Sequence, residues 1–262
     1  MTEEFLIKAS GIFFVTIIRI SGFFMNLPAF GESIVPATIK AGLSTICCLL
    51  MLPHLIQTQT LPTMSTLGYG LMAIKELGIG LTMGFVVIIT IEGIKFAGAL
   101  IGVQIGLSFV QVADPESNIS QAVFAEFLQL FAILIFLMLE GHLILLRVFF
   151  ESFDLIPLTQ MVFTGDLVSN IMDLTSNIFW LGLQISMPIL CAAMLTDIAL
   201  GIIARTVPRL NVFEIGFALK LSLGFSLMIV CLPFISDITK ALIQKVFGNV
   251  SLILNLMSPK IK

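Results

Sequence analysis

Charged residues are scarce in this sequence. Asp, Glu, Lys and Arg together make up 11% of its 262 residues, against about 25% in ordinary soluble domains. Hydrophobic residues make up 58%, which is more than a soluble core can bury, so the sequence predicts an all-α integral membrane protein. The net charge is only −3 and no basic cluster is present, which argues against nucleic acid as a partner.

Side chains that build catalytic or metal centres are also few. The two histidines, His54 and His142, are far apart, and no nucleophile-elbow or zinc-protease motif is present. The four cysteines stand in apolar surroundings without metal-ligand spacing, as is typical of core residues: Cys47, Cys48, Cys191 and Cys231. The sequence therefore predicts no catalytic residue, no metal site, no cofactor and no enzyme.

Uninterrupted apolar runs of membrane-spanning length are nearly absent. Charges, prolines and clustered glycines break most segments, and only residues 174–196 form a clean span, with a kink expected at Pro188. The helix expected over about 122–153 is too long for one crossing, so it either extends beyond the bilayer or breaks near Gly141. Because the interruptions would face lipid in a lone protein, they favour a chain wrapped by other subunits.

Three charges lie inside apolar segments. Arg19 is deep within the first of them, where a cation costs about 2.5–3.5 kcal/mol in lipid, so it is expected to face protein or water. Glu92 and Lys95 are spaced i,i+3, which places them on one helix face. They either neutralise each other inside a bundle or contact a partner subunit.

The polar segments predict on which side of the membrane each loop lies. Residues 1–4 are acidic, unlike the start of a secretory signal, so no cleaved signal peptide is expected. Arg205 and Arg209 occupy a short loop that the positive-inside rule places in the cytoplasm. An acidic loop is expected over 151–173, one span earlier, and is predicted to be periplasmic.

Glycines recur every fourth position in the segment 78–115. In lipid, such spacing lets neighbouring helices approach closely, and it is found at Gly80 and Gly84 and again at Gly98, Gly102 and Gly106. Farther on, Pro115 disfavours a helical conformation at the residue before it while the sequence stays apolar. The pattern predicts a close-packed helix that runs into an apolar, non-helical loop; a tightly packed helix followed by a simple turn is the alternative.

Four segments, in order along nearly the whole chain, resemble the export-gate family of type III secretion that includes flagellar FliR and its injectisome counterparts. Each is weak alone, but the ordered set is specific. One departure is Ala99, where the family often carries Glu. The segments are GALIGVQIGLSF (98–109) with Asp114 and Pro115; Gly141 and His142 followed by Pro157; 199–201 with Arg205, Pro208 and Asn211; and Phe213, Gly216, Phe217 and Gly224.

The resemblance implies a non-enzymatic part of a protein secretion channel in the bacterial inner membrane, at the flagellar basal body. Homologues of FliP, FliQ and FlhB would be its partners, and exported unfolded proteins its cargo. Residues 1–165 would be a FliP-like part of kinked helical hairpins, and residues 166–262 a FliQ-like hairpin. The tip of that hairpin, at Arg205, Pro208 and Arg209, would lie in the cytoplasm.

By the same resemblance, the apolar loop would project into the pore as a plug. Its apolar side chains suit a constriction that excludes water, and glycine allows the bend at its start. The residues assigned to the plug are Gly106, Leu107, Ser108, Phe109, Val110, Gln111, Val112 and Asp114.

The main alternative is a secondary transporter. Glycine-broken helices and the intramembrane charges Arg19, Glu92 and Lys95 would also suit a polar site at the bilayer midplane. Such a protein is expected to show internal repeats, and no convincing repeat of the glycine-rich segment is found. The choice between flagellum and injectisome, and the identity of the exported proteins, stay open at the level of sequence.

Overall fold

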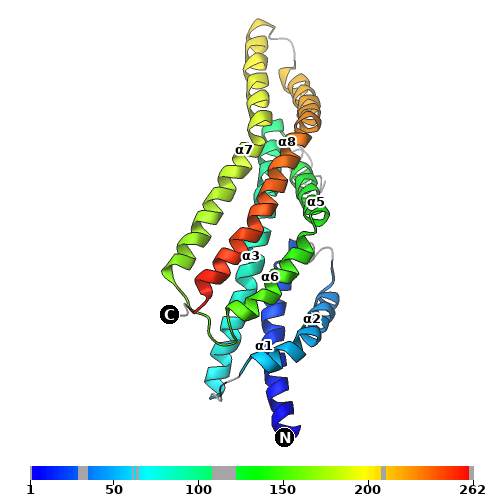
Figure 1. Cartoon of the computed structure of the whole chain (residues 1–262). Helices are drawn as coiled ribbons and strands as arrows, with labels where there is room; N and C mark the ends of the chain where they lie inside the picture. Colours follow the sequence, from blue (N-terminus) through cyan, green and yellow to red (C-terminus); the bar gives the residue numbers. More distant parts are fainter. Residues whose placement is uncertain are drawn as a thin grey trace. The chain divides into compact units, whose positions relative to one another are not determined.

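The structure is a computed structural model that describes residues 2–28, 35–60, 62, 65–107, 122–207 and 211–259. In these residues it is built of α-helices without strands, as predicted for an all-α protein (Figure 1). The helices are α1 (Thr2–Met25), α2 (Ala37–Thr58), α3 (Thr66–Ile105), α5 (Ala122–Met138), α6 (Gly141–Leu155), α7 (Gly165–Thr206) and α8 (Val212–Met257).

Most of these helices could cross a membrane. Within the described residues, five helices are long and apolar enough to cross a membrane: α1, α2, α3, α7 and α8. The pair α5 and α6 adds a sixth span if it counts as one broken crossing. The break lies near Gly141, as one of the two sequence alternatives predicted, and Glu140 there adopts φ +54°.

One boundary predicted from sequence is wrong. The acidic loop expected over 151–173 is mostly helical, because α6 continues to Leu155 and α7 already begins at Gly165. The acidic residues that suggested a loop, Glu151 and Asp166 among them, are exposed on the surfaces of these two helix ends. The prediction took these acidic residues, with Pro157 and Gly165 as helix breakers, for one loop, but only the residues between Leu155 and Gly165 lie outside the two helices.

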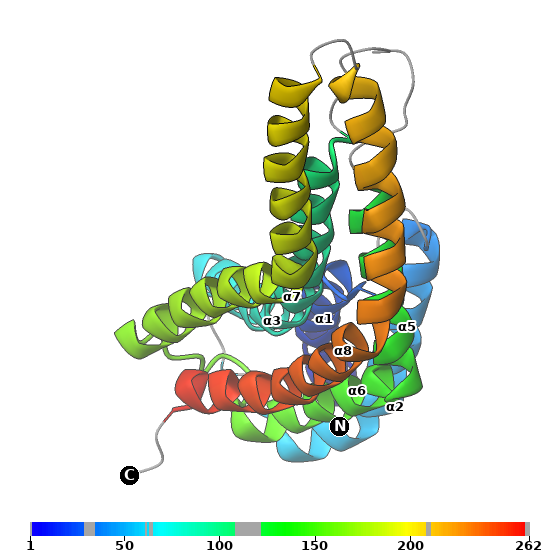
Figure 2. The same ribbon diagram turned by 90° about the horizontal axis from the view of Figure 1, so that it is seen from above.

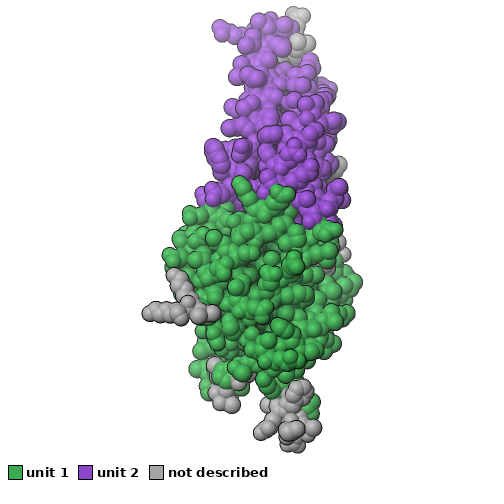
Figure 3. Space-filling model, viewed as in Figure 1, with its two compact units in different colours: residues 1–89, 140–174, 243–262 green, residues 90–139, 175–242 purple. Residues whose placement is uncertain are grey.

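The chain forms two compact units (Figure 3). Unit 1 comprises residues 1–89, 140–174 and 243–262, and unit 2 comprises 90–139 and 175–242. The helices α3, α7 and α8 each contribute residues to both units. These units are groups of residues that pack together in space. The predicted division between residues 165 and 166 instead separates two consecutive parts of the chain. The two units therefore do not test that division, which stays a prediction.

Unit 1 is organised by a close approach of α1 and α3. A Cβ atom added at Gly80 would overlap the carbonyl group of Arg19 on α1, and one at Gly84 would lie 2.7 Å from Cβ of Asn26. One turn earlier, Gly22 of α1 would bring its Cβ within 2.9 Å of a backbone oxygen of α3. Only glycine permits these contacts, since the neighbouring atoms belong largely to the backbone and cannot rotate away.

Unit 2 has a separate apolar core. The second half of α3 packs against α5 at Gly98, where an added Cβ would overlap the carbonyl oxygen of Phe124. The later part of α7 and the earlier part of α8 form a hairpin whose two arms lie side by side (Figures 1 and 2). The fully or nearly fully buried core residues include Ile94, Ile101, Ile105, Phe124, Leu128, Ile185, Ile189 and Ile235.

Candidate functional site

The helix α3 ends in a glycine cap at the start of the predicted plug. The N–H of Gly106 donates to the carbonyl of Val103, and the N–H of Leu107 donates to that of Gly102, both at 3.1 Å. This pair of bonds is the Schellman motif, and its left-handed residue is Gly106, with φ +96°. A side chain at this position would be strained, so glycine fixes the direction in which the chain leaves the helix.

The first plug residue after the cap is packed on protein. Leu107 is partly buried against the apolar core of unit 2. Gly102, one of the predicted packing glycines, is buried in the last turn of α3. The remaining residues assigned to the plug, Ser108, Phe109, Val110, Gln111, Val112 and Asp114, lie outside the described residues.

A polar contact links the end of α3 to both arms of the hairpin. The Asp197 carboxylate on α7 pairs with the Lys220 ammonium on α8 and accepts a 3.3 Å hydrogen bond from Nε2 of Gln104 on α3. The lysine side chain is only 19% exposed, which strengthens the pair relative to one in open solvent. These three residues escaped sequence reasoning because nothing in their spacing links positions 104, 197 and 220.

The tip of the hairpin is described only in part. Arg205 is exposed in the last turn of α7, where a cation interacts favourably with the helix dipole. Across the loop, the side-chain amide of Asn211 donates to the Glu214 carboxylate at 3.1 Å. Pro208 and Arg209 lie outside the described residues.

Glu92 and Lys95 lie together on unit 2. Their carboxylate oxygen and ammonium nitrogen are 3.8 Å apart, and the side chains are 47% and 37% exposed. The pair thus lies at the surface of this chain and not in its core. At the surface, a partner subunit could contact it.

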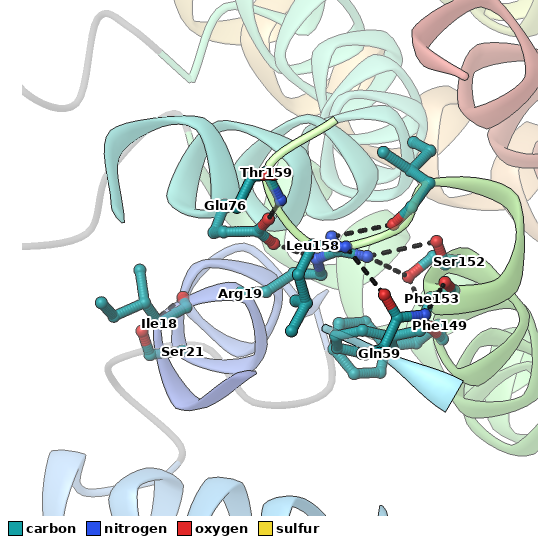
Figure 4. A network of polar contacts seen from close by, with 11 residues as sticks. Ile18, Arg19, Ser21, Gln59, Glu76, Phe149, Ser152, Phe153, Leu158 and Thr159 are labelled. Atoms are coloured by element: carbon teal, nitrogen blue, oxygen red, sulfur yellow. Dashed lines mark hydrogen bonds and ion pairs between the residues drawn. The ribbon is translucent and has the colours of Figure 1, made fainter. Parts of the chain in front are cut away.

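Unit 1 contains a buried polar cluster centred on Arg19 (Figure 4). The guanidinium is fully buried, and its Nε donates to Glu76 Oε2 at 2.5 Å. Its other nitrogens donate to the carbonyl oxygens of Ser152 and Ile156, each at 3.1 Å. The ring centroid of Phe153 lies 4.2 Å from the guanidinium carbon, which adds a cation–π contact.

The same cluster fixes the turn between α6 and α7. The second carboxylate oxygen of Glu76 accepts the N–H of Thr159 at 3.0 Å. Gln59, also buried, donates to the carbonyl of Phe153 and accepts the N–H of Leu158, both at 3.1 Å. Thr159 has φ +77°, which is strained for a β-branched residue, so the cluster holds the turn in a conformation it would not adopt alone.

The charged groups of this cluster pair with each other. We call it the Arg19 cluster, and its members are Arg19, Gln59, Glu76, Ser152 and Thr159. Because the guanidinium is already bonded to a carboxylate and two carbonyls, it is unavailable to a ligand. The partner Glu76 was missed in the sequence, where it reads only as an interruption beside Lys75. The transporter alternative loses support, since Arg19 is bonded to Glu76 while Glu92 and Lys95 pair with each other.

Comparison with known proteins covers almost the whole chain. Residues 11–246 match the family described as bacterial export proteins, family 1. Flagellar biosynthetic protein FliR of Escherichia coli (strain K12) is 29% identical over 248 residues, which are 95% of this chain and 94% of that protein. The FliR of Pectobacterium carotovorum subsp. carotovorum is 31% identical over 246 residues (94% of each chain), and that of Bacillus subtilis (strain 168) is 32% identical over 226 residues (85% of this chain and 86% of that protein).

Proposed function

The chain belongs to the bacterial export proteins, family 1, as a multi-pass inner-membrane component of the flagellar export apparatus, and we propose that it forms the secretion channel there with homologues of FliP and FliQ. It acts without catalysis, in association with an FlhB homologue, and unfolded proteins pass through the assembly. The match over residues 11–246 carries the proposal.

The surface of unit 2 supports a role in a hetero-oligomer. In the candidate spans of α7 and α8, only 17% of the residues in the most apolar stretch are buried within this chain, so most of their apolar surface must be covered by lipid or by other subunits. Charged side chains stand on the same helices: Asp197 is 45% exposed and Asp237 79% exposed. Both carboxylates are paired within this chain, with Lys220 and Lys240, but lipid would leave their exposed sides poorly solvated, whereas helices of other subunits can supply further polar partners. The exposed apolar side chains include Trp180, Met194, Ile198, Ile202, Ile229 and Val230.

We further propose that residues 106–114 plug the closed channel. The Schellman cap at Gly106 and the packing of Leu107 on the core of unit 2 give the loop a fixed base. The contact of Gln104 with Asp197 ties that base to the hairpin. A loop held at its base and apolar beyond it suits a closure that excludes water and ions and that an exported chain displaces.

We also propose a division of the chain, which rests on the resemblance described above. Residues 1–165 are the FliP-like part that carries the plug, and residues 166–262 are the FliQ-like hairpin with its tip near 205–209 in the cytoplasm. The exposed Arg205 at the end of α7 agrees with the positive-inside rule for such a tip.

Membership of a larger assembly is tested by gentle detergent extraction of the tagged chain and native mass spectrometry. The expected result is a complex containing one copy of this chain with several copies of two other small membrane proteins. A parallel extraction in a harsh detergent should release the chain alone, which controls for non-specific aggregation. A monomer from the gentle extraction that transports a solute by itself would contradict the assignment.

The plug is tested by replacing residues 107–112 with Gly and Ser. Because the apolar bulk that excludes water is lost, ion conductance of membranes containing the assembly is expected to rise severalfold. A matched control exchanges Leu107, Val110 and Val112 for Ile, which keeps the bulk and should keep the membranes tight. If the Gly/Ser variant assembles normally and its membranes stay as tight as those of the control, this segment is not the seal.

A further inference from the structure

The end of α3 contacts both arms of the hairpin in unit 2. On α7, Asp197 accepts the hydrogen bond of Gln104 Nε2 at 3.3 Å and pairs with Lys220 of α8. On α8, a Cβ atom added at Gly224 would overlap Cδ1 of Ile105, so this glycine makes room for the last helical residue of α3. All five residues belong to unit 2. Three helices therefore meet at this point, and one polar contact joins their side chains.

Lys220 stands between two glycines on one side of α8. Gly216, Lys220 and Gly224 are four residues apart, so they lie on the same face of the helix. A Cβ atom added at Gly216 would lie 2.9 Å from Cδ1 of Leu200 on α7, which shows that this face is turned toward the other arm. A lysine in a row of small residues at a helix contact needs an acceptor for its ammonium group. Asp197 is that acceptor among the described contacts.

We call Gln104, Asp197 and Lys220 the hairpin clasp. Lys220 borders a space of only about 10 Å³ among residues of all three helices, including Ile105 and Ala193, which is at the lower limit for one water molecule. Its side chain is 19% exposed and that of Asp197 is 45% exposed. Such a pair is stronger than one in open water, but its exposed side lets water or another charge compete for either partner. The contact can therefore hold the three helices together and still be broken.

A charged pair is an unusual way to hold two apolar helices together. Burial of an ion pair costs desolvation free energy that well-packed apolar side chains avoid, so it is weak evidence for a role in stability. The best-attested use of such groups is to fix one register or to act as a switch. Here the pair fixes α7 against α8, and the bond from Gln104 extends this arrangement to the end of α3.

We propose that the hairpin clasp is a switch of the channel. When it is formed, it keeps both arms of the hairpin on the end of α3 and the channel is closed to ions. When it is broken, the arms part and the channel opens. This inference rests on the channel function proposed above. Gln104, Asp197 and Lys220 are positioning residues, because they act through the placement of α3 and the two arms.

Charge reversal tests the clasp in the assembled complex. Asp197→Lys places two ammonium groups together between the arms, so ion leakage per assembled complex is expected to rise severalfold. The double variant Asp197→Lys with Lys220→Asp restores an ion pair with exchanged charges. Because the amide of Gln104 can donate or accept, it can bond to either charge, and leakage is expected to return to the wild-type value. A purely structural role would lower the amount of complex without changing the tightness of the complexes that form.

The matched control is Asp237→Lys. Asp237 is 79% exposed and pairs with Lys240 on its own helix, so its reversal joins or separates no two helices and should leave leakage unchanged. Equal leakage after Asp197→Lys and Asp237→Lys would overturn the proposal, as would a double variant that leaks as much as Asp197→Lys alone. If Asp197→Lys does not assemble, Asp197→Asn removes the charge with little change of shape. Leakage equal to that of the wild type in this milder variant would also overturn the proposal.

The experiment separates the clasp from the seal proposed above. If the Gly/Ser variant of residues 107–112 leaks while Asp197→Lys assembles and stays tight, the clasp alone is wrong. If both variants assemble and stay tight, the seal is wrong as well.

Discussion

Arg19→Met is expected to lower the free energy of unfolding by about 3–5 kcal/mol, the cost of leaving one member of a buried ion pair uncompensated. The Glu76 carboxylate is fully buried and would keep only the N–H of Thr159 as a partner among its described contacts. The carbonyl of Ile156 would lose the guanidinium as a donor, and that of Ser152 would keep only the N–H of Ile156 among its described donors. The unfolding midpoint of the chain in detergent, followed by circular dichroism, measures the effect.

Two further variants serve as controls. One removes an exposed arginine, and the other removes both charges of the buried pair. Arg147→Met removes an arginine that is 81% exposed and 3.9 Å from Glu151, so a change of at most about 1 kcal/mol is expected. The double variant Arg19→Met with Glu76→Met removes both buried charges and should recover part of the lost stability. If Arg19→Met is no more harmful than Arg147→Met, the Arg19 cluster does not hold unit 1 together.

Gly98→Ala is expected to destabilise the protein by about 1–3 kcal/mol, although alanine is the better helix former. The added methyl group would overlap the carbonyl oxygen of Phe124 and lie 2.6 Å from Cα of Ala125. Both are backbone atoms of α5, so no rotamer change relieves the clash and the two helices must move apart. The unfolding midpoint reports the loss, and the amount of assembled complex reports its consequence for the channel.

The control for this change is Gly201→Ala. Nothing lies within 4 Å of the Cβ position at Gly201, so the methyl group meets open space on the exposed surface of α7. Its stability is expected to stay the same or to rise, because the helix loses less backbone entropy on folding. Equal effects of the two substitutions would mean that the close approach of α3 and α5 does not depend on glycine.

Local features of the fold could be predicted from sequence because they depend on residues that are neighbours along the chain. Hydropathy predicted membrane helices. The length of the 122–153 segment left two alternatives, extension beyond the bilayer or a break near Gly141, and the structure has the break, at Glu140. The i,i+3 spacing of Glu92 and Lys95 placed them on one face, where they pair. The boundary at 151–173 failed, since acidic residues on the exposed side of a helix look like a loop in composition.

The sequence by itself determined a membrane-embedded, helical chain with glycine-lined helix faces, a cation deep within an apolar segment at Arg19 and an apolar segment after Gly106. Only the tertiary structure decided that Arg19 pairs with Glu76, 57 residues away, and that Asp197 joins Lys220 and Gln104. The physical reason is that helix periodicity fixes which side of a helix a residue occupies, whereas its partner depends on which other helix packs there. That choice is made by the shape of whole surfaces, such as the backbone contact at Gly80, and no spacing along the chain encodes it.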